Sequence, residues 1–100
     1  MKKNPTPKSP QKPAPWQVYI LQCSDNSLYT GYTNNLPNRL KKHNSGRGAA
    51  YTRSRLPVKI VYQESHLTKS SAMKREIEIK KWKRVKKLAL IKNDKNSRKS

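Results

Sequence analysis

The run Trp16 to Cys23 (WQVYILQC) is rich in aliphatic and aromatic side chains, and this run constrains the fold more than any other feature. Such a segment is typical of a strand that is buried on both faces. Apolar residues form only 32% of the sequence, below the roughly 45–50% of an ordinary domain. The 100 residues therefore allow one small domain with polar tails and no second core.

A second short β-prone run, Leu28 to Thr33 (LYTGYT), follows the turn-forming residues Ser24 to Ser27 (SDNS). The two runs predict an antiparallel hairpin. Gly31 lies inside the second strand, where a glycine weakens strand pairing. It therefore indicates a bulge, or a point at which another group approaches the backbone closely.

The segment after the hairpin predicts a helix and then a loop. Asn34 or Asn35 can cap a helix that accepts Pro37 in its first turn. The helix ends in the segment 45–48 (SGRG), and residues 49–56 form a basic loop.

The second half of the chain predicts one strand and two helices. Val58, Ile60 and Tyr62 alternate with other residues, which is typical of a half-buried third strand. A helix starts at Thr68 or Ser70 and reaches Lys80. After a break near 83–84, a last helix buries its apolar residues, Val85, Leu88, Leu90 and Ile91. The predicted order is β-β-α-β-α-α, and the domain spans residues 16–91.

Both ends of the chain are polar and basic. Residues 1–15 hold five prolines and four lysines, so we expect a disordered basic arm. The arm lacks Arg and an apolar stripe, which argues against a mitochondrial presequence. Residues 92–100 are predicted to form a disordered basic tail.

The charge balance points to a polyanionic partner. Lys and Arg number 24 against five acids, and the formal net charge is +19. Nucleic acid is the commonest large polyanion. No apolar run approaches the roughly 18 residues that suggest a membrane span, and no secretory signal is present. We therefore expect a cytoplasmic protein without a membrane partner, and the lone cysteine excludes an intramolecular disulfide.

The scarcity of acids limits the metal chemistry. Five acids cannot easily build a two-metal site, which needs several convergent carboxylates. Glu76 and Glu78 are two residues apart on a predicted helix and point to different sides. Any metal site therefore has about one protein carboxylate. That suits magnesium, which keeps several waters and takes other ligands from a substrate phosphate.

Four side chains in the first half of the domain are candidates for chemistry. Tyr19 and Tyr29 stand on the two hairpin strands, where their rings can be neighbours. Arg39 and His43 are four residues apart and share one face of the predicted helix, along the edge between core and solvent. Taken singly, each residue has an ordinary structural explanation.

Taken together, the pattern resembles a known family. Tyr, Tyr-x-Gly, Arg-x-x-x-His and Glu-x-x-Ile-Lys follow one another in a single small basic domain. This set resembles the GIY-YIG endonuclease superfamily. The stretches 29–55 and 72–82 are similar to its small stand-alone bacterial members.

The resemblance implies an α+β fold, with a three-stranded antiparallel sheet flanked by helices. It also implies hydrolysis of a DNA phosphodiester with one bound Mg²⁺ or Mn²⁺. A phenol is a poor base at neutral pH, because its reference pKa is about 10. The site must therefore stabilise the phenolate. The implied roles are general base for Tyr29, its neighbour or substitute for Tyr19, close packing for Gly31, phosphate clamp for Arg39, its partner for His43 and metal ligand for Glu76.

Further basic residues can contact DNA outside this set. They are Arg47, Tyr51, Arg53 and Arg55 on the predicted loop, and Lys80, Lys81, Lys83 and Arg84 near the last two helices. No sequence-reading module is recognisable, so we expect DNA to be recognised by structure rather than by sequence. A monomer is the default expectation.

Two alternatives remain open at this point. The chain could be a non-catalytic nucleic-acid-binding module on the same scaffold, or a ribosome-associated or RNA-coating basic protein. The net charge alone cannot separate them, since cations alone produce non-specific phosphate binding. A lone carboxylate inside a positive site favours the nuclease, because it weakens phosphate binding unless a metal ion lies between.

Overall fold

The computed structural model describes residues 15–99, and the side chains of residues 15–93. The arm predicted for residues 1–15 lies outside the described residues apart from Pro15. One antiparallel sheet, in the order β2-β1-β3, contains β1 (Trp16–Gln22), β2 (Leu28–Thr33) and β3 (Lys59–His66). The strand that is rich in aliphatic and aromatic residues is therefore the central one, and the predicted hairpin is confirmed.

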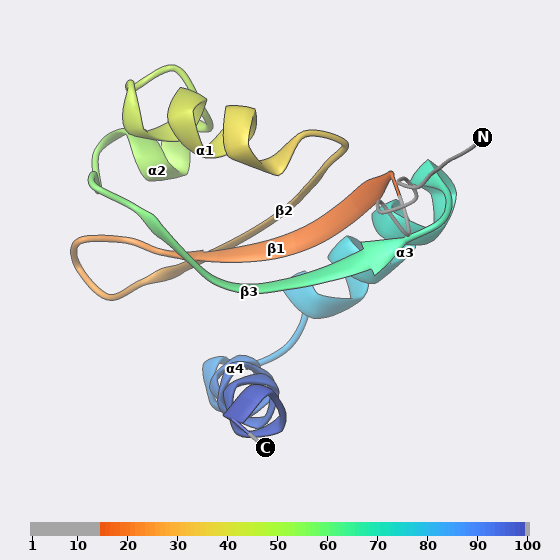
Figure 1. Ribbon diagram of the computed structural model, residues 1–100. Coiled ribbons are helices and arrows are strands. Elements are labelled where there is room, and N and C mark those ends of the chain that lie inside the picture. Colours follow the sequence, from red (N-terminus) through yellow and green to blue (C-terminus); the bar gives the residue numbers. More distant parts are fainter. Residues whose placement is uncertain (1–14, 100) are drawn as a thin grey trace.

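Helices cover both faces of the sheet (Figure 1). On one side lie α1 (Leu36–Asn44) and the single turn α2 (Ala50–Arg53); on the other lie α3 (Lys69–Lys80) and α4 (Arg84–Lys99). The predicted α+β class and the order β-β-α-β-α-α are confirmed, with α2 as an addition. No helix in the described part of the chain is both long and apolar enough to cross a bilayer.

The turn α2 forms where the sequence predicts a basic loop. The carbonyl oxygen of Ala49 accepts hydrogen bonds from the Arg53 amide at 3.1 Å and from the Thr52 hydroxyl at 3.0 Å. These two local bonds close one helical turn, and the Thr52 side chain becomes fully buried beneath it.

A β-bulge in β3 determines which of its side chains face α3 and α4 and which face α1. Ile20 pairs with Tyr62, whereas the next residue, Leu21, pairs with Ile60, so Val61 is the extra residue. Tyr62 consequently packs with Ile20 in the cluster under α3 and α4, while Ile60 packs with Leu21 in the cluster that includes α1. Simple alternation predicts one shared face for Ile60 and Tyr62, and that prediction is wrong.

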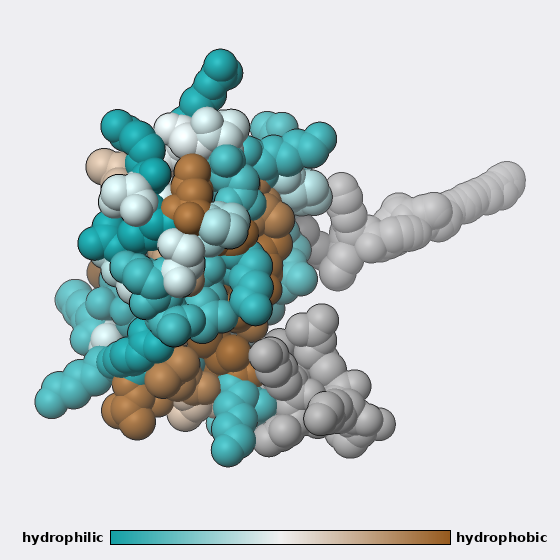
Figure 2. Space-filling view, turned by 90° about the vertical axis from the view of Figure 1, so that its left-hand side faces the viewer, coloured by the Kyte–Doolittle hydropathy of each residue, from teal (hydrophilic) through white to brown (hydrophobic). Residues whose placement is uncertain are grey.

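The last helix begins where the sequence predicts, but its end and its buried residues differ from the prediction. It continues to Lys99 rather than ending at Ile91, because the segment 92–99 has neither Gly nor Pro to stop it. Ile91 is buried as predicted, but Val85 is 73% exposed and Leu88 is 41% exposed. Val85 and Ile91 are separated by about 120° around the helix, so they cannot both face the sheet. Figure 2 shows apolar surface at the level of α4 in Figure 1.

Glu64 on β3 accepts three hydrogen bonds, and the one from Arg75 joins β3 to α3. Its carboxylate accepts from the Tyr62 hydroxyl at 2.5 Å, from the His66 imidazole at 2.6 Å and from the Arg75 guanidinium at 2.9 Å. Burial opposes ionisation, yet these hydrogen bonds hold the pKa of Glu64 below its ordinary value. The ionised carboxylate is therefore the form that stabilises this junction.

We predict that Glu64→Gln lowers the free energy of unfolding by about 1–3 kcal/mol at neutral pH, the range for hydrogen bonds to a charged group. The carboxyl pKa is lower in the folded than in the unfolded chain. The contribution is therefore full above the unfolded value and is lost as the pH falls through the folded value. Urea unfolding of both proteins from neutral to acid pH measures this difference.

The control for this prediction is Glu78→Gln. Glu78 is an exposed carboxylate that pairs with Arg75 at 3.1 Å, and its loss should cost less than about 1 kcal/mol. A Glu64→Gln difference that stays constant down to acid pH would contradict the assignment of the stabilising form.

Candidate active-site cleft

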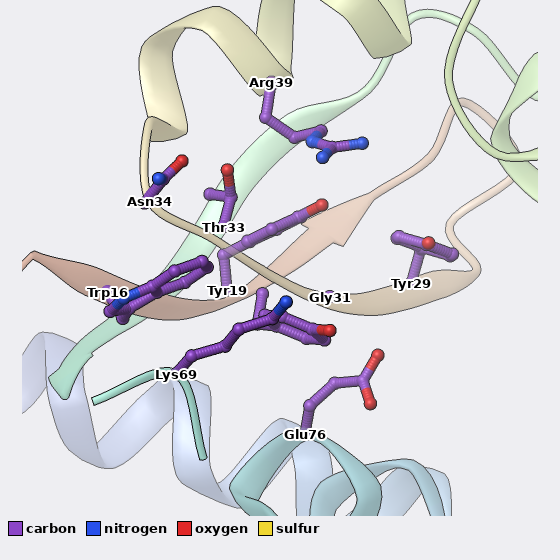
Figure 3. A pocket seen from close by; sticks show the side chains of 10 residues that line it. Trp16, Tyr19, Tyr29, Gly31, Thr33, Asn34, Arg39, Lys69 and Glu76 are labelled. Atoms are coloured by element: carbon purple, nitrogen blue, oxygen red, sulfur yellow. The ribbon is translucent and has the colours of Figure 1, made fainter. Parts of the chain in front are cut away.

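A cleft of about 370 Å³ lies beside the edge strand β2 and is lined from β1, β2, α1 and α3 (Figure 3). Four of the side chains that the sequence singles out line it, namely Tyr19, Tyr29, Arg39 and Glu76, and Gly31 lines it as well. Residues 57 positions apart in the chain, from Tyr19 to Glu76, are thus brought to one place.

Tyr19 reaches the cleft because Gly31, opposite it, has no side chain. Tyr19 on β1 and Gly31 on β2 are paired in the sheet, so a side chain at position 31 would rise on the same face as the Tyr19 ring. A Cβ on Gly31 would lie 2.5 Å from the Tyr19 hydroxyl oxygen and 2.7 Å from the ring carbon that bears it. Of the two possibilities that the sequence leaves for Gly31, the structure shows the close approach of another group, the Tyr19 ring, to its backbone.

A buried chain of hydrogen-bonding groups continues inward from Tyr19. The Tyr19 hydroxyl oxygen lies 3.2 Å from His43 Nε2, and His43 Nδ1 lies 2.8 Å from the Thr52 hydroxyl oxygen. Burial raises the pKa of the Tyr19 phenol. Burial, together with the nearby charges of Arg39 and Lys42, lowers the pKa of His43. Tyr19 therefore keeps its proton, and His43 is neutral.

The position of His43 differs from the prediction. The sequence predicts that Arg39 and His43 share one helix edge at the boundary between core and solvent. Arg39 lines the cleft, but His43 is only 1% exposed, because the segment that contains α2 closes over it. His43 does not line the cleft itself, but its Nε2 contacts the hydroxyl of Tyr19, which does.

Arg39 enters the cleft from α1. The helix begins at Leu36 because the Asn35 side chain accepts a hydrogen bond from the Asn38 amide at 3.2 Å, as the predicted cap requires. This start places Arg39 in the first turns, and Figure 3 shows its guanidinium extending over the Tyr19 ring.

Glu76 enters from α3 on the opposite side. Figure 3 shows its carboxylate pointing toward the cleft from below the Tyr19 ring. The side chain is 13% exposed and pairs with Lys80 at 3.1 Å. Glu78 instead pairs with Arg75 at 3.1 Å. The expectation that the two glutamates point to different sides of the helix is confirmed.

Tyr29 is held by a stack of side chains behind the cleft. Its ring centroid lies 5.3 Å from that of His43 and 6.1 Å from that of Tyr51, which it stacks on. The Arg55 guanidinium lies 4.0 Å over the Tyr51 ring and also binds Asp25 at 3.1 Å. Tyr51 and Arg55, which the sequence singles out for DNA contact, therefore already contact other side chains of the protein, although Tyr51 is 40% exposed.

The other predicted DNA contacts lie outside the cleft lining. Lys80 is the partner of Glu76, whereas Arg47, Arg53, Lys81, Lys83 and Arg84 are exposed. The cleft also contains residues that the sequence analysis did not select: Trp16, Tyr32, Thr33, Asn34 and Lys69. Trp16 and Tyr32 lie 6.1 Å apart between ring centroids. The predicted hairpin already places Trp16 and Tyr32 on neighbouring strands. Nothing in the sequence indicates that Lys69, the first residue of α3, lines the cleft.

The donor set of the cleft fits one hard cation. Among the described residues, no three His, Cys, Asp or Glu side chains converge. Glu76 is the carboxylate that lines the cleft. One carboxylate is too few for a zinc or calcium cage. It is sufficient for magnesium, which retains waters and binds substrate phosphate.

The fold and the cleft define a class: a small antiparallel α+β domain with one arginine, one carboxylate and three tyrosines around the edge strand. The family model of the GIY-YIG catalytic domain matches residues 15–89, and the chain belongs to this nuclease-type family.

Known relatives are similar over the same region. A UPF0213 protein of Staphylococcus aureus (strain Mu3) is 60% identical over 75 residues, which cover 75% of this chain and 92% of that protein. The solution NMR structure of a UPF0213 protein from Bacillus halodurans has 47% identity and a TM-score of 0.51. That of a protein from E. faecalis has 42% identity and a TM-score of 0.54. Each of these two alignments covers 77% of this chain and 82% of the other.

We predict that Gly31→Ala destabilises the protein by about 1–3 kcal/mol, the usual cost of overpacking. The added methyl group would force the buried Tyr19 ring out of its place and away from His43. Urea unfolding measures the loss of stability, and near-ultraviolet circular dichroism reports the changed tyrosine environment.

Gly46→Ala is the matched control for this prediction. Gly46 has a φ of +83° and open space around its Cβ position, so alanine there costs about 1 kcal/mol through backbone conformation and leaves Tyr19 in place. A Gly31→Ala protein with wild-type spectrum and stability would show that the ring does not depend on this glycine.

Proposed function

We propose that this protein is a metal-dependent endonuclease that hydrolyses a phosphodiester bond of DNA in the cleft beside β2. The convergence of Tyr29, Arg39 and Glu76 from three separate elements carries the proposal. A protein that only bound polyanions would gain nothing from a carboxylate there, since it repels phosphate. Membership in a nuclease-type family supports the same class of reaction.

Arg39 is the phosphate clamp of the proposed reaction. Its planar guanidinium can donate two parallel hydrogen bonds to the non-bridging oxygens of one phosphate. Because it is fixed on α1 and lines the cleft, it can stabilise the negative charge that develops on those oxygens.

Glu76 is the residue that would hold one Mg²⁺ or Mn²⁺ ion. Such an ion, when bound, supplies positive charge to the phosphate and to the departing 3′ oxygen. In the structure the Glu76 carboxylate pairs with the Lys80 ammonium at 3.1 Å. Among the described residues, the cleft contains no further acid that could repel DNA.

Tyr29 is the proposed general base for the attacking water. Tyr19 is the weaker candidate, because burial raises the pKa of its phenol and the hydroxyl is already engaged by His43. Tyr29 is less buried, and its ring is fixed by Tyr51 and His43.

DNA recognition in this proposal depends on charge and shape. The net charge of +19 and the exposed cations around α1 and the α3–α4 junction suit the phosphate backbone. These groups carry no base code, so we propose that DNA structure rather than sequence selects the substrate. Repair or recombination is the process that such a substrate preference would serve.

We predict that the wild-type protein cuts DNA with Mg²⁺ or Mn²⁺ and not with EDTA. Supercoiled, single-stranded and branched DNA are the substrates of a gel assay. Glu76→Gln should abolish cutting and leave binding equal or tighter, because a negative charge has left the cleft. Glu78→Gln is the matched control two residues away, and it should cut normally. A wild type that binds DNA but never cuts it with either metal would be a nucleic-acid-binding module on the same fold.

We predict that Tyr29→Phe lowers kcat by about 10²–10⁴-fold, the usual contribution of a general base. DNA affinity should stay unchanged, because the ring keeps its stacking on Tyr51 and loses only the hydroxyl. Single-turnover cleavage and a binding titration measure the two quantities. Tyr19→Phe should cost less; a larger loss for Tyr19→Phe would move the role of base to Tyr19.

A further inference from the structure

The contacts of Thr52 determine which nitrogen of His43 carries its proton. The Thr52 hydroxyl oxygen lies 2.8 Å from His43 Nδ1 and 3.0 Å from the carbonyl oxygen of Ala49. A hydroxyl has one proton, and a carbonyl oxygen can only accept, so Thr52 donates to Ala49. A lone pair of the hydroxyl then faces His43, and Nδ1 must be the nitrogen that donates.

The other side of the ring follows from this assignment. Burial, with Arg39 and Lys42 nearby, lowers the pKa of His43, so the ring is neutral and carries one hydrogen. Because that hydrogen is on Nδ1, Nε2 is an acceptor. The Tyr19 hydroxyl, 3.2 Å away, therefore donates its proton inward to Nε2.

The neighbouring segment is also shaped around the imidazole. A Cβ on Gly48 would collide with His43 Nδ1 and lie 2.8 Å from the ring carbon Cγ. The absence of a side chain at Gly48 lets the ring approach, and the Thr52 hydroxyl then meets Nδ1 beneath α2. Two features of one short segment thus fix the plane and the orientation of His43.

We infer that Thr52 is a positioning residue that fixes His43 in the Nδ1–H form and thereby makes the Tyr19 oxygen a hydrogen-bond acceptor toward the cleft. The single phenolic proton points inward, so the remaining lone pairs of that oxygen face the cleft and can accept a hydrogen bond from water. With the proton on Nε2, His43 would donate to Tyr19, and the phenol would present a donor to the cleft instead. The value of this polarity for catalysis rests on the proposed function.

Nitrogen NMR of the histidine side chains tests the inference without any activity. The chain contains two histidines, and His66 is an internal reference. His66 Nε2 lies 2.6 Å from the Glu64 carboxylate, which can only accept, so His66 carries hydrogen on Nε2. At a pH at which both imidazole rings are neutral, we expect the hydrogen on Nδ1 in His43 and on Nε2 in His66. A wild-type spectrum with hydrogen on Nε2 of His43 overturns the inference.

Two substitutions at Thr52 separate the hydroxyl from the shape of the side chain. Thr52→Val keeps the branched shape and removes the acceptor, so the His43 signals should move toward the Nε2–H form. Thr52→Ser keeps the hydroxyl and should keep the wild-type pattern. A folded Thr52→Val protein with an unchanged tautomer overturns the role of Thr52. Should Thr52→Val fail to fold, the wild-type spectrum still decides the tautomer, because hydrogen on Nε2 of His43 would overturn the inference by itself.

Cleavage rates then connect the tautomer to the cleft. Thr52→Val should lower kcat about 10–100-fold, as is usual when an orienting partner is lost, and Thr52→Ser should restore most of it. A Thr52→Val protein with the shifted tautomer and the wild-type rate overturns the claim that the polarity of Tyr19 matters. A wild type that has the expected tautomer but never cuts DNA refutes the proposed nuclease and supports the tautomer assignment.

Discussion

The contact between the Tyr19 ring and the backbone of Gly31 is the constraint on which the rest of the cleft depends. Tyr19 belongs to the central strand, where a side chain would ordinarily be enclosed by its neighbours. The missing side chain on the edge strand lets the phenol lie across β2 and bring its hydroxyl to the sheet edge. At that edge, helices from both faces of the sheet can reach it, with Arg39 on α1 and Glu76 on α3.

The segment that contains α2 supports both tyrosines of the cleft. Thr52 contacts His43, which contacts the hydroxyl of Tyr19. The adjacent residue Tyr51 stacks on Tyr29, and Arg55 fixes that stack through Asp25 in the β1–β2 turn. A segment that looks like a basic surface loop therefore positions the phenols from behind. The two hydrogen bonds to the Ala49 carbonyl oxygen close the helical turn, and that turn places Tyr51 and Thr52 against their partners.

The sequence predicts the sheet and the main contributors to the cleft because those signals are local or carried by several residues together. The apolar composition of β1, the Asn35 cap of α1 and the spacing of Glu76 and Glu78 are of this kind. Burial of His43 could not be predicted, because it depends on the later segment that folds over α1. The bulge at Val61 likewise cannot be seen in an alternating pattern. The extra residue turns Ile60 and Tyr62 to opposite faces of the sheet, while the sequence still alternates. Cations such as Arg55 carry no signal that separates an internal partner from a DNA contact.

The distribution of acids gives the strongest reason to regard Glu76 as functional. The structure describes four acidic side chains, and three of them have structural partners away from the cleft. Asp25 is bound by Ser27 and Arg55, Glu64 by three donors, and Glu78 by Arg75. Glu76 alone among these four lines the cleft. Glu76 pairs with Lys80 at 3.1 Å, yet a carboxylate at that position still weakens phosphate binding in a protein with a net charge of +19. The placement of Glu76 therefore supports the proposed nuclease, in which a divalent ion would bind at this carboxylate, over a simple polyanion-binding role.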